Sequence, residues 1–183
     1  KPYTIFMDGL SKAFAATGVR VGWAFGPQKV INKMKSILGH VGAWSPKAEQ
    51  MACAEYLKDT TAMDAYLKDF RAAVYERLEA FYQGFQNLKA KGFPVDAIAP
   101  QAAIYLTVQF DLVGKTSPSG EVLNNTKAVT DYILKEAKTA IVPFYAFGAS
   151  DSSTWYRLSV GTAKMEDIPA FFEQLESVIA GLK

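Results

Sequence analysis

Apolar residues in the first part of the chain have the spacing of strands and then of a helix. Short apolar and aromatic runs at residues 3–7 and 19–25 predict two strands. Asp8-Gly9 is expected to end the first strand, and Gly26-Pro27 the second. Residues 28–38 then place Val, Ile, Met and Leu at helical spacing. The chain is therefore predicted to begin strand, strand, helix.

Two further helices are predicted in the middle of the chain. Ser45-Pro46 is typical of a helix start, with Ser as N-cap and Pro at the first helical position, and this helix is expected to reach residue 57. Thr60 or Thr61 is expected to cap the next helix, whose apolar periodicity continues to residue 88. This helix is longer than usual. Such helices often bridge two domains; a simple hairpin helix is the alternative.

The second half alternates between strand and helix patterns. The polar residues 112–125, with Gly, Ser and Pro, predict a surface loop. Strands are predicted at 103–110, 140–142 and 154–160, and helices at 126–137 and 165–182. The order β-α-β-β-α predicts an α+β unit, and the whole chain is assigned to the α/β class with an α+β small domain.

Composition narrows the function classes. Of the 183 residues, 50% are hydrophobic and 21% charged, which is ordinary for a soluble globular protein. The net charge is +2, and lysines and arginines form no dense block, so nucleic-acid binding is not expected. One cysteine, Cys53, allows no internal disulfide and supports no cysteine-based metal site. A Ser-His-Asp triad would have to use the one histidine, His40, and no nucleophile-elbow motif accompanies it.

The ends of the sequence add two expectations. No apolar run reaches membrane-spanning length, so no membrane association is expected. The start KPYTIFMDGL has no initiator Met and no signal-peptide pattern, and its strand-like composition suggests an internal cut in a longer protein. A cytoplasmic location is expected.

The segment SKAFAATGVRVGW, residues 11–23, carries the most suggestive chemistry. Arg20 stands among apolar residues and needs an anionic partner if it is buried; a phosphate suits the guanidinium fork. Lys12 lies eight residues earlier and can act as an amine nucleophile beside such a site. The alternative is a solvated loop on which these cations pair with a carboxylate such as that of Asp8.

DGLSKAFAATGVRVGWAFGP, residues 8–27, resembles the Schiff-base lysine signature of class I/II aminotransferases, which are fold-type I pyridoxal-phosphate (PLP) enzymes. The resemblance implies that Lys12 forms the Schiff base with PLP and later carries the α-proton, and that Arg20 binds the cofactor phosphate. The family often has a hydroxyl residue three before the lysine. Gly9 stands there instead, and Ser11 is the substitute candidate for phosphate binding.

The resemblance extends over the rest of the chain. TWYRLSVGTA, residues 154–163, is similar to the strand that carries the family's substrate-binding arginine, which implies that Arg157 holds the substrate α-carboxylate. An ordinary strand arginine in a salt bridge is the alternative. PQAAIYL and PFYAFG resemble the small-domain strand and the loop before the arginine strand. Trp44-Ser45-Pro46 resembles the segment that approaches the neighbouring subunit's cofactor in family dimers, which implies Ser45 as a candidate contact.

The family pattern implies a C-terminal portion of such an enzyme. Residues 1–44 would be a remnant of the PLP-binding large domain, 45–88 the connecting helices, and 89–183 the small C-terminal domain. The phosphate turn, the ring-stacking aromatic, and the Asn, Tyr and Asp around the cofactor ring lie upstream in the family. Asp8 is not taken as the partner of the ring nitrogen, because it lies on the approach to the lysine itself.

The expected reaction is PLP-dependent transfer of an amino group between an amino acid and a 2-oxo acid, as in the aspartate aminotransferase branch. The full-length form is expected to be a homodimer, and the isolated chain to be inactive. The alternatives are a non-catalytic truncated α+β module, or another fold-type I PLP enzyme such as a decarboxylase, a lyase or an acyl-CoA-dependent synthase. The apolar N-terminal strands are expected to cause self-association or a mobile N-terminal segment.

Overall fold

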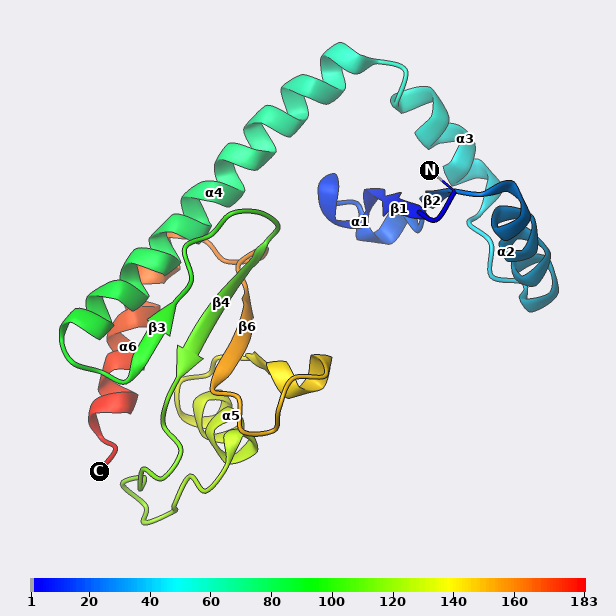
Figure 1. Cartoon of the computed structure of the whole chain (residues 1–183). Helices are drawn as coiled ribbons and strands as arrows, with labels where there is room; N and C mark the ends of the chain where they lie inside the picture. Colours follow the sequence, from blue (N-terminus) through cyan, green and yellow to red (C-terminus); the bar gives the residue numbers. More distant parts are fainter. Residues whose placement is uncertain (1) are drawn as a thin grey trace. The chain divides into compact units, whose positions relative to one another are not determined.

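A computed structural model describes residues 2–183, which fall into two compact units (Figure 1). Unit 1 ends at Arg71, and unit 2 is Ala72–Lys183. The long helix α4 (Thr60–Ala90) contributes its first residues to unit 1 and the remainder to unit 2. Among the described residues no helix is long and apolar enough to cross a membrane.

Unit 1 is built around a small antiparallel strand pair. Phe6 lies opposite Phe25, and Gly9 lies opposite Gly22. A helical turn and a 3₁₀ turn connect the two strands, and two helices follow. The elements are β1 (Phe6–Gly9), α1 (Leu10–Ala13), η1 (Thr17–Val19), β2 (Gly22–Phe25), α2 (Gln28–Val41) and α3 (Lys47–Tyr56).

The two strands of unit 1 differ from the prediction because two glycines face each other. A Cβ on Gly9 would lie 3.0 Å from the Val21 carbonyl oxygen, and one on Gly22 would lie 3.0 Å from the Asp8 carbonyl oxygen. Pairing therefore continues through Asp8-Gly9, and the prediction that these residues end the strand is wrong. The second strand is shorter than predicted, because residues 17–19 form the 3₁₀ turn.

The starts of the two middle helices also differ in detail. α3 begins at Lys47 with Pro46 as N-cap, and no side chain caps it. Ser45 instead uses its carbonyl oxygen to accept a hydrogen bond from the Gln50 side chain at 2.6 Å. At the start of α4 the Asp59 carboxylate accepts from the Ala62 N–H at 3.0 Å. Asp59, rather than either of the threonines after it, therefore satisfies a free backbone donor there.

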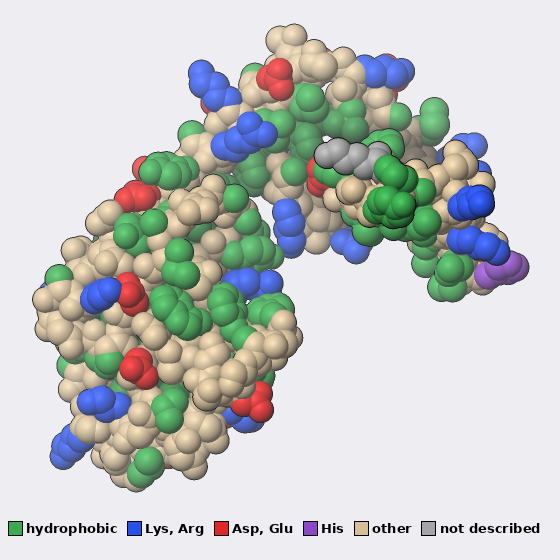
Figure 2. Space-filling model, viewed as in Figure 1, with side chains coloured by type: hydrophobic (Ala, Val, Ile, Leu, Met, Phe, Trp, Pro, Cys, Tyr) green, Lys and Arg blue, Asp and Glu red, His purple; other side chains and the backbone are tan. Residues whose placement is uncertain are grey.

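Much of the apolar surface of unit 1 faces solvent. Leu10 and Cys53 are buried, but Met7 is 71% exposed and Val41 is 70% exposed. On the face drawn in Figure 2, hydrophobic side chains lie at the surface of this unit. The strands and helices of unit 1 are therefore held mainly by local hydrogen bonds and a small apolar centre.

Unit 2 is a four-stranded antiparallel sheet with helices beside it (Figure 1). The strand order is β3-β4-β6-β5. Strand β3 was not predicted, because three residues are too few to show an alternating pattern. The elements after α4 are β3 (Val95–Ala97), β4 (Tyr105–Phe110), α5 (Thr126–Glu136), β5 (Val142–Pro143), η2 (Phe144–Phe147), β6 (Trp155–Ser159), η3 (Met165–Asp167) and α6 (Ile168–Ala180).

The two faces of this sheet have different surroundings. Side chains alternate along β4 and β6, and the buried set belongs to the core. That core packs the sheet against apolar positions of α4, α5 and α6; its members from the two central strands are Leu106, Val108, Phe110, Tyr156 and Leu158. The intervening residues, Tyr105, Thr107, Gln109 and Arg157, are half-buried on the other face. The sheet therefore presents Arg157 away from the helix-covered face.

Gly84→Ala is expected to destabilise unit 2. A Cβ at Gly84 of α4 would lie 2.1 Å from the ring of Phe172, which also contacts Phe81, Phe85 and Phe171. Overpacking of this kind costs about 1–3 kcal/mol of unfolding free energy. Urea unfolding followed by Trp155 fluorescence, with the other two tryptophans replaced by Phe, measures the loss.

The matched control is Gly39→Ala in α2, where an added Cβ meets nothing within 4 Å. This substitution is expected to leave unit 2 unchanged. Phe172→Leu introduced beside Gly84→Ala is expected to recover part of the lost stability. An unchanged midpoint for Gly84→Ala alone would contradict the packing.

Unit 2 is expected to lose stability in acid through Asp96. Burial alone would raise the pKa of Asp96, but hydrogen bonds from Lys89, Gln86 and the Ala97 N–H together lower it below its usual 3.8. A lowered pKa in the folded state gives stability that is present above the ordinary pKa and is lost as the pH falls through the folded-state pKa. The Asp96→Asn variant should therefore have a lower free energy of unfolding than the unchanged chain at about pH 7. This difference in unfolding free energy should be smaller at about pH 3. Urea unfolding at both values measures this, and an equal difference at both would contradict it.

Candidate functional site

The segment around Lys12 is folded back on itself by hydrogen bonds. The Thr17 hydroxyl donates to the Ser11 carbonyl oxygen at 3.0 Å, and Arg20 Nη1 donates to the Thr17 carbonyl oxygen at 2.9 Å. The Leu10 N–H also donates to the Val21 carbonyl oxygen at 3.2 Å, beside the glycine pair of β1 and β2. These bonds bring Lys12 and Arg20, eight residues apart, to one place.

Ser11, Lys12 and Arg20 line one hollow of about 410 Å³ in unit 1, together with Asp8, Gly9, Ala13, Val21 and Gly22. Lys12 and Arg20 are exposed to solvent and Ser11 is half-buried. Arg20 has a left-handed backbone, with φ +58°. A non-glycine residue in this region carries strain of about 1–3 kcal/mol and persists where its surroundings fix it. The bond from Arg20 to Thr17 is such a constraint.

The cations of this hollow have no acidic partner within the described part of the chain. No ion pair joins Asp8 to Lys12 or to Arg20 among residues 2–183. Asp8 instead uses Oδ1 to accept a hydrogen bond from the Gly9 N–H at 2.7 Å. The structure therefore does not contain the Asp8 ion pair that was the alternative explanation of these residues.

The donor set of the hollow fits the reactive ends of PLP. A phosphate is bound by guanidinium and hydroxyl donors. Within residues 2–183 the Arg20 side chain makes one hydrogen bond to protein, so further donors of its fork remain for a ligand. An aldehyde needs a nearby amine, which Lys12 supplies on the same hollow. No cluster of three or more His, Cys, Asp or Glu side chains in residues 2–183 is arranged to hold a metal ion.

Arg157 lies in unit 2 and contacts two aromatic rings. Its guanidinium carbon is 4.4 Å from the centre of the Tyr105 ring and 4.5 Å from that of Phe147. Its Nε is buried and has no hydrogen-bond partner in the described chain, and no carboxylate pairs with it there. The salt bridge that was the alternative for this residue is therefore absent from residues 2–183. Both rings are close enough for cation–π contact with the guanidinium, which stabilises the cation and restricts its movement.

Tyr105 and Phe147 were not singled out from the sequence as parts of a site. Both stand in segments that resemble the family, PQAAIYL and PFYAFG, but nothing in the spacing showed that their rings meet the arginine. The antiparallel pairing that puts Thr107 opposite Arg157 places Tyr105 on the same face, two residues away. Ser45 stands just before α3 and is not among the residues that line the Lys12 hollow.

Comparison with known proteins identifies the class to which this architecture belongs. Residues 1–175 match the family described as aminotransferase class I and II. The chain belongs to the class I and II aminotransferase family. The sequence resemblance to this family is thereby confirmed.

Individual relatives agree with this assignment. A probable aspartate/prephenate aminotransferase of Rickettsia conorii is 27% identical over 181 residues, covering 94% of this chain and 41% of the relative. An aspartate aminotransferase of Rhizobium meliloti is 28% identical over 167 residues, covering 91% of this chain and 38% of the relative.

Solved structures give the same fold. The crystal structure of a Rhizobium meliloti aspartate aminotransferase matches with a TM-score of 0.81 and 25% identity, covering 100% of this chain and 43% of that one. Aspartate aminotransferase from Thermus thermophilus with maleate matches with a TM-score of 0.79 and 27% identity, covering 96% and 41%. The chain thus spans 38% to 43% of the length of these relatives. The fold class is confirmed, and the coverage is consistent with a C-terminal portion of an aminotransferase.

Phe147 and Arg157 are expected to be energetically coupled. Phe147→Leu removes one ring from the guanidinium, and a stacked pair at a partly exposed site contributes about 0.5–1 kcal/mol. Phe147→Leu should therefore destabilise unit 2 when Arg157 is present and have less effect beside Arg157→Gln. A double-mutant cycle, read by hydrogen exchange of the buried β4 and β6 amides, measures this coupling. Additive effects of the two substitutions would contradict it.

Proposed function

We propose that this chain carries the lysine, phosphate and carboxylate contacts of a PLP-dependent aminotransferase, which moves an amino group between an amino acid and a 2-oxo acid. The observation that carries the proposal is the shared hollow of Lys12, Ser11 and Arg20, with both cations free of ion pairs in the described chain. Family membership supports it. The names of the relatives favour an aspartate aminotransferase-like enzyme.

Each residue has a separate task in this proposal. When bound, PLP supplies an aldehyde that accepts amines and a ring that withdraws electrons. Lys12 would be the amine that holds the cofactor at its aldehyde end. Once the substrate amine has displaced it, the freed Lys12 Nζ would carry the proton that leaves the substrate α-carbon. Arg20 would bind the phosphate through guanidinium N–H donors, and the Ser11 hydroxyl would add a hydrogen bond.

Arg157 has the role of binding the substrate α-carboxylate. Two coplanar N–H donors of a guanidinium match the two oxygens of a carboxylate, and the fork fixes orientation as well as position. Tyr105 and Phe147 both contact the guanidinium and would restrict its position before a carboxylate binds. A lysine at this position would keep the charge and lose the bidentate geometry.

The proposal also covers the organisation of the full enzyme. Residues 1–44 would belong to a PLP-binding large domain, 45–88 would be connecting helices, and 89–183 a small domain. The full-length form would be a cytoplasmic homodimer, in which Ser45 lies near the neighbouring subunit's cofactor. Because the family's remaining cofactor contacts lie in segments upstream of the lysine signature, the chain alone is expected to show no amino transfer from aspartate to 2-oxoglutarate.

The lysine and phosphate roles are tested by trapping. The chain is incubated with PLP, reduced with borohydride and mapped by mass spectrometry. Lys12 should be labelled ahead of other exposed lysines such as Lys29 and Lys33, and PLP should label it faster than pyridoxal, which lacks the phosphate. Since a charged hydrogen bond contributes about 1.5–3 kcal/mol, the preference for PLP over pyridoxal should be at least about tenfold.

Arg20→Gln should reduce that preference for PLP over pyridoxal towards unity, while Arg71→Gln, on α4, serves as the matched control and should leave it unchanged. Lys12→Ala should abolish the visible band of the lysine adduct. Equal labelling of Lys12, Lys29 and Lys33 in the unchanged chain would refute the proposed site. Turnover of aspartate by the chain alone would refute the expectation that it is inactive.

A further inference from the structure

The single helical turn that carries Lys12 depends on contacts from outside the turn. Helix α1 has four residues, and no side chain in the described part of the chain caps it; a single helical turn is unstable by itself. Ala15, immediately beyond it, has a left-handed backbone with φ +51°. Such strain in a non-glycine residue persists only where contacts from elsewhere fix the backbone.

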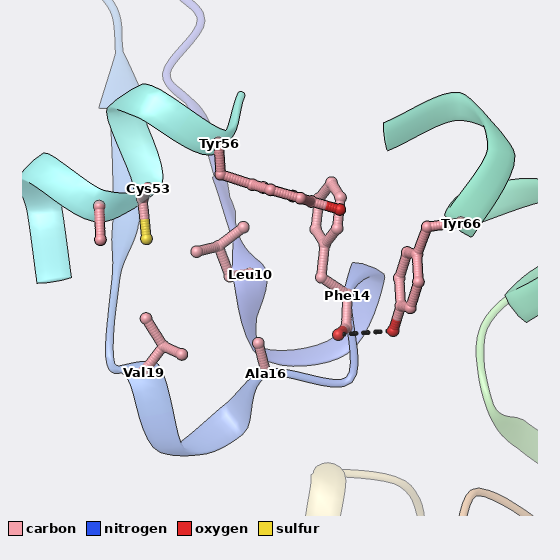
Figure 3. A pocket seen from close by; sticks show the side chains of 8 residues that line it. Leu10, Phe14, Ala16, Val19, Cys53, Tyr56 and Tyr66 are labelled. Carbon is pink, nitrogen blue, oxygen red and sulfur yellow. Dashed lines mark hydrogen bonds between the residues drawn. The ribbon is translucent and has the colours of Figure 1, made fainter. Parts of the chain in front are cut away.

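A residue in the first turns of α4 contacts the backbone next to Ala15. The Tyr66 hydroxyl donates a hydrogen bond to the Phe14 carbonyl oxygen at 2.9 Å, across 52 residues of sequence (Figure 3). The two rings are stacked, with centres 6.2 Å apart and planes at 5°. The Tyr56 ring of α3 meets the Phe14 ring edge-on, at 6.0 Å and 83°.

The hydrogen bond acts on the peptide that follows Phe14. That peptide joins Phe14 to Ala15, so fixing its carbonyl restricts the rotation that gives Ala15 its left-handed backbone. The Ala15 and Phe14 N–H groups in turn donate to the carbonyl oxygens of Lys12 (3.4 Å) and Leu10 (3.1 Å). The Tyr66 hydroxyl therefore contacts the backbone at the C-terminal end of the helical turn that carries Lys12.

The turn also has two sides with different surroundings. Leu10 and Phe14, four residues apart, lie on one side and line an apolar pocket of about 350 Å³ with Val19, Cys53 and Tyr66 (Figure 3). Ser11 and Lys12 lie in the polar hollow with Arg20. Anchoring the apolar side thus sets the direction in which the other side presents the Lys12 amine.

We propose that Tyr66 is a positioning residue for Lys12, acting through the Phe14 carbonyl and the strained backbone at Ala15. The inference rests on the proposed function, in which Lys12 is the reacting amine. It assigns to the start of the long helix a role in the reaction that does not involve touching the cofactor.

The test compares Tyr66→Phe with Tyr56→Phe. Both variants keep a ring against Phe14, but only the first removes a hydrogen bond, since the Tyr56 hydroxyl has none among residues 2–183. In Tyr66→Phe the Phe14 and Ala16 amides, which both donate to the Leu10 carbonyl oxygen, should exchange with solvent about fivefold to tenfold faster. Tyr56→Phe should leave their exchange unchanged.

The second readout is the ratio of PLP labelling at Lys12 to that at Lys29, after borohydride reduction of the full chain. This ratio should fall severalfold in Tyr66→Phe and stay constant in Tyr56→Phe. Unchanged amide exchange in Tyr66→Phe, or an equal effect in both variants, would overturn the inference. Faster exchange with an unchanged labelling ratio would also overturn it, because Tyr66 would then hold the turn without positioning the amine.

These results are distinguishable from a failure of the proposed function. If the unchanged chain labels Lys12 no faster than Lys29, the proposed role of Lys12 is wrong, and with it the positioning role of Tyr66. If the unchanged chain prefers Lys12 and Tyr66→Phe retains that preference, the proposed function stands and the role of Tyr66 is wrong.

Discussion

The alternation of side chains along β6 is the constraint on which unit 2 depends. Tyr156 and Leu158 belong to the core, so the residue between them must point to the other face of the sheet. A shift of one residue in the β4–β6 register would bury the Arg157 guanidinium and expose the Tyr156 ring. The apolar positions of α4 and α6 that pack on the core face exclude that alternative. The presentation of the arginine is thus a consequence of how the core is filled.

In unit 1 the site residues are held in place by side-chain hydrogen bonds to backbone carbonyl oxygens. Its apolar centre is small, and the segment from Ser11 to Arg20 is held by bonds to carbonyl oxygens and by the glycine pair behind it. Two non-glycine residues there, Ala15 and Arg20, have left-handed backbones. Strained positions of this kind gather at functional sites more often than elsewhere. The strain in this segment therefore agrees with the role proposed for Lys12 and Arg20.

The elements with strong periodicity could be predicted from the sequence. α4, β4, β6 and α6 have enough apolar repeats to fix their type, and the side of β6 on which Arg157 lies follows from the same pattern. The chemistry and spacing of Lys12 and Arg20 suggested an amine nucleophile beside a phosphate site. The family resemblance identified the cofactor and added Ser11 and Arg157, because lysine and arginine at this spacing do not identify a cofactor on physical grounds alone. The prediction that Asp8-Gly9 ends the first strand was wrong, because the sequence does not show that Gly9 pairs with Gly22 in the folded chain.

Other features could not be read from the sequence because they depend on contacts between distant residues. The three-residue β3 is a strand only by pairing with β4. The rings of Tyr105 and Phe147 reach Arg157 through tertiary packing, and the Tyr66 hydroxyl meets Phe14 across 52 residues. Linear patterns show which residue types are present, whereas these contacts depend on the direction in which each side chain leaves its element.

Arg20 and Arg157, which have no acidic partner in residues 2–183, also affect how the protein behaves in solution. A guanidinium that is not neutralised by its own chain attracts whatever small anion the solvent offers, and phosphate or sulfate suits its fork well. Common buffer salts would then compete for Arg20 and Arg157 and lower the apparent affinity for any phosphorylated or carboxylated ligand. Affinities measured for this chain therefore acquire meaning only together with the identity and concentration of the buffer anion.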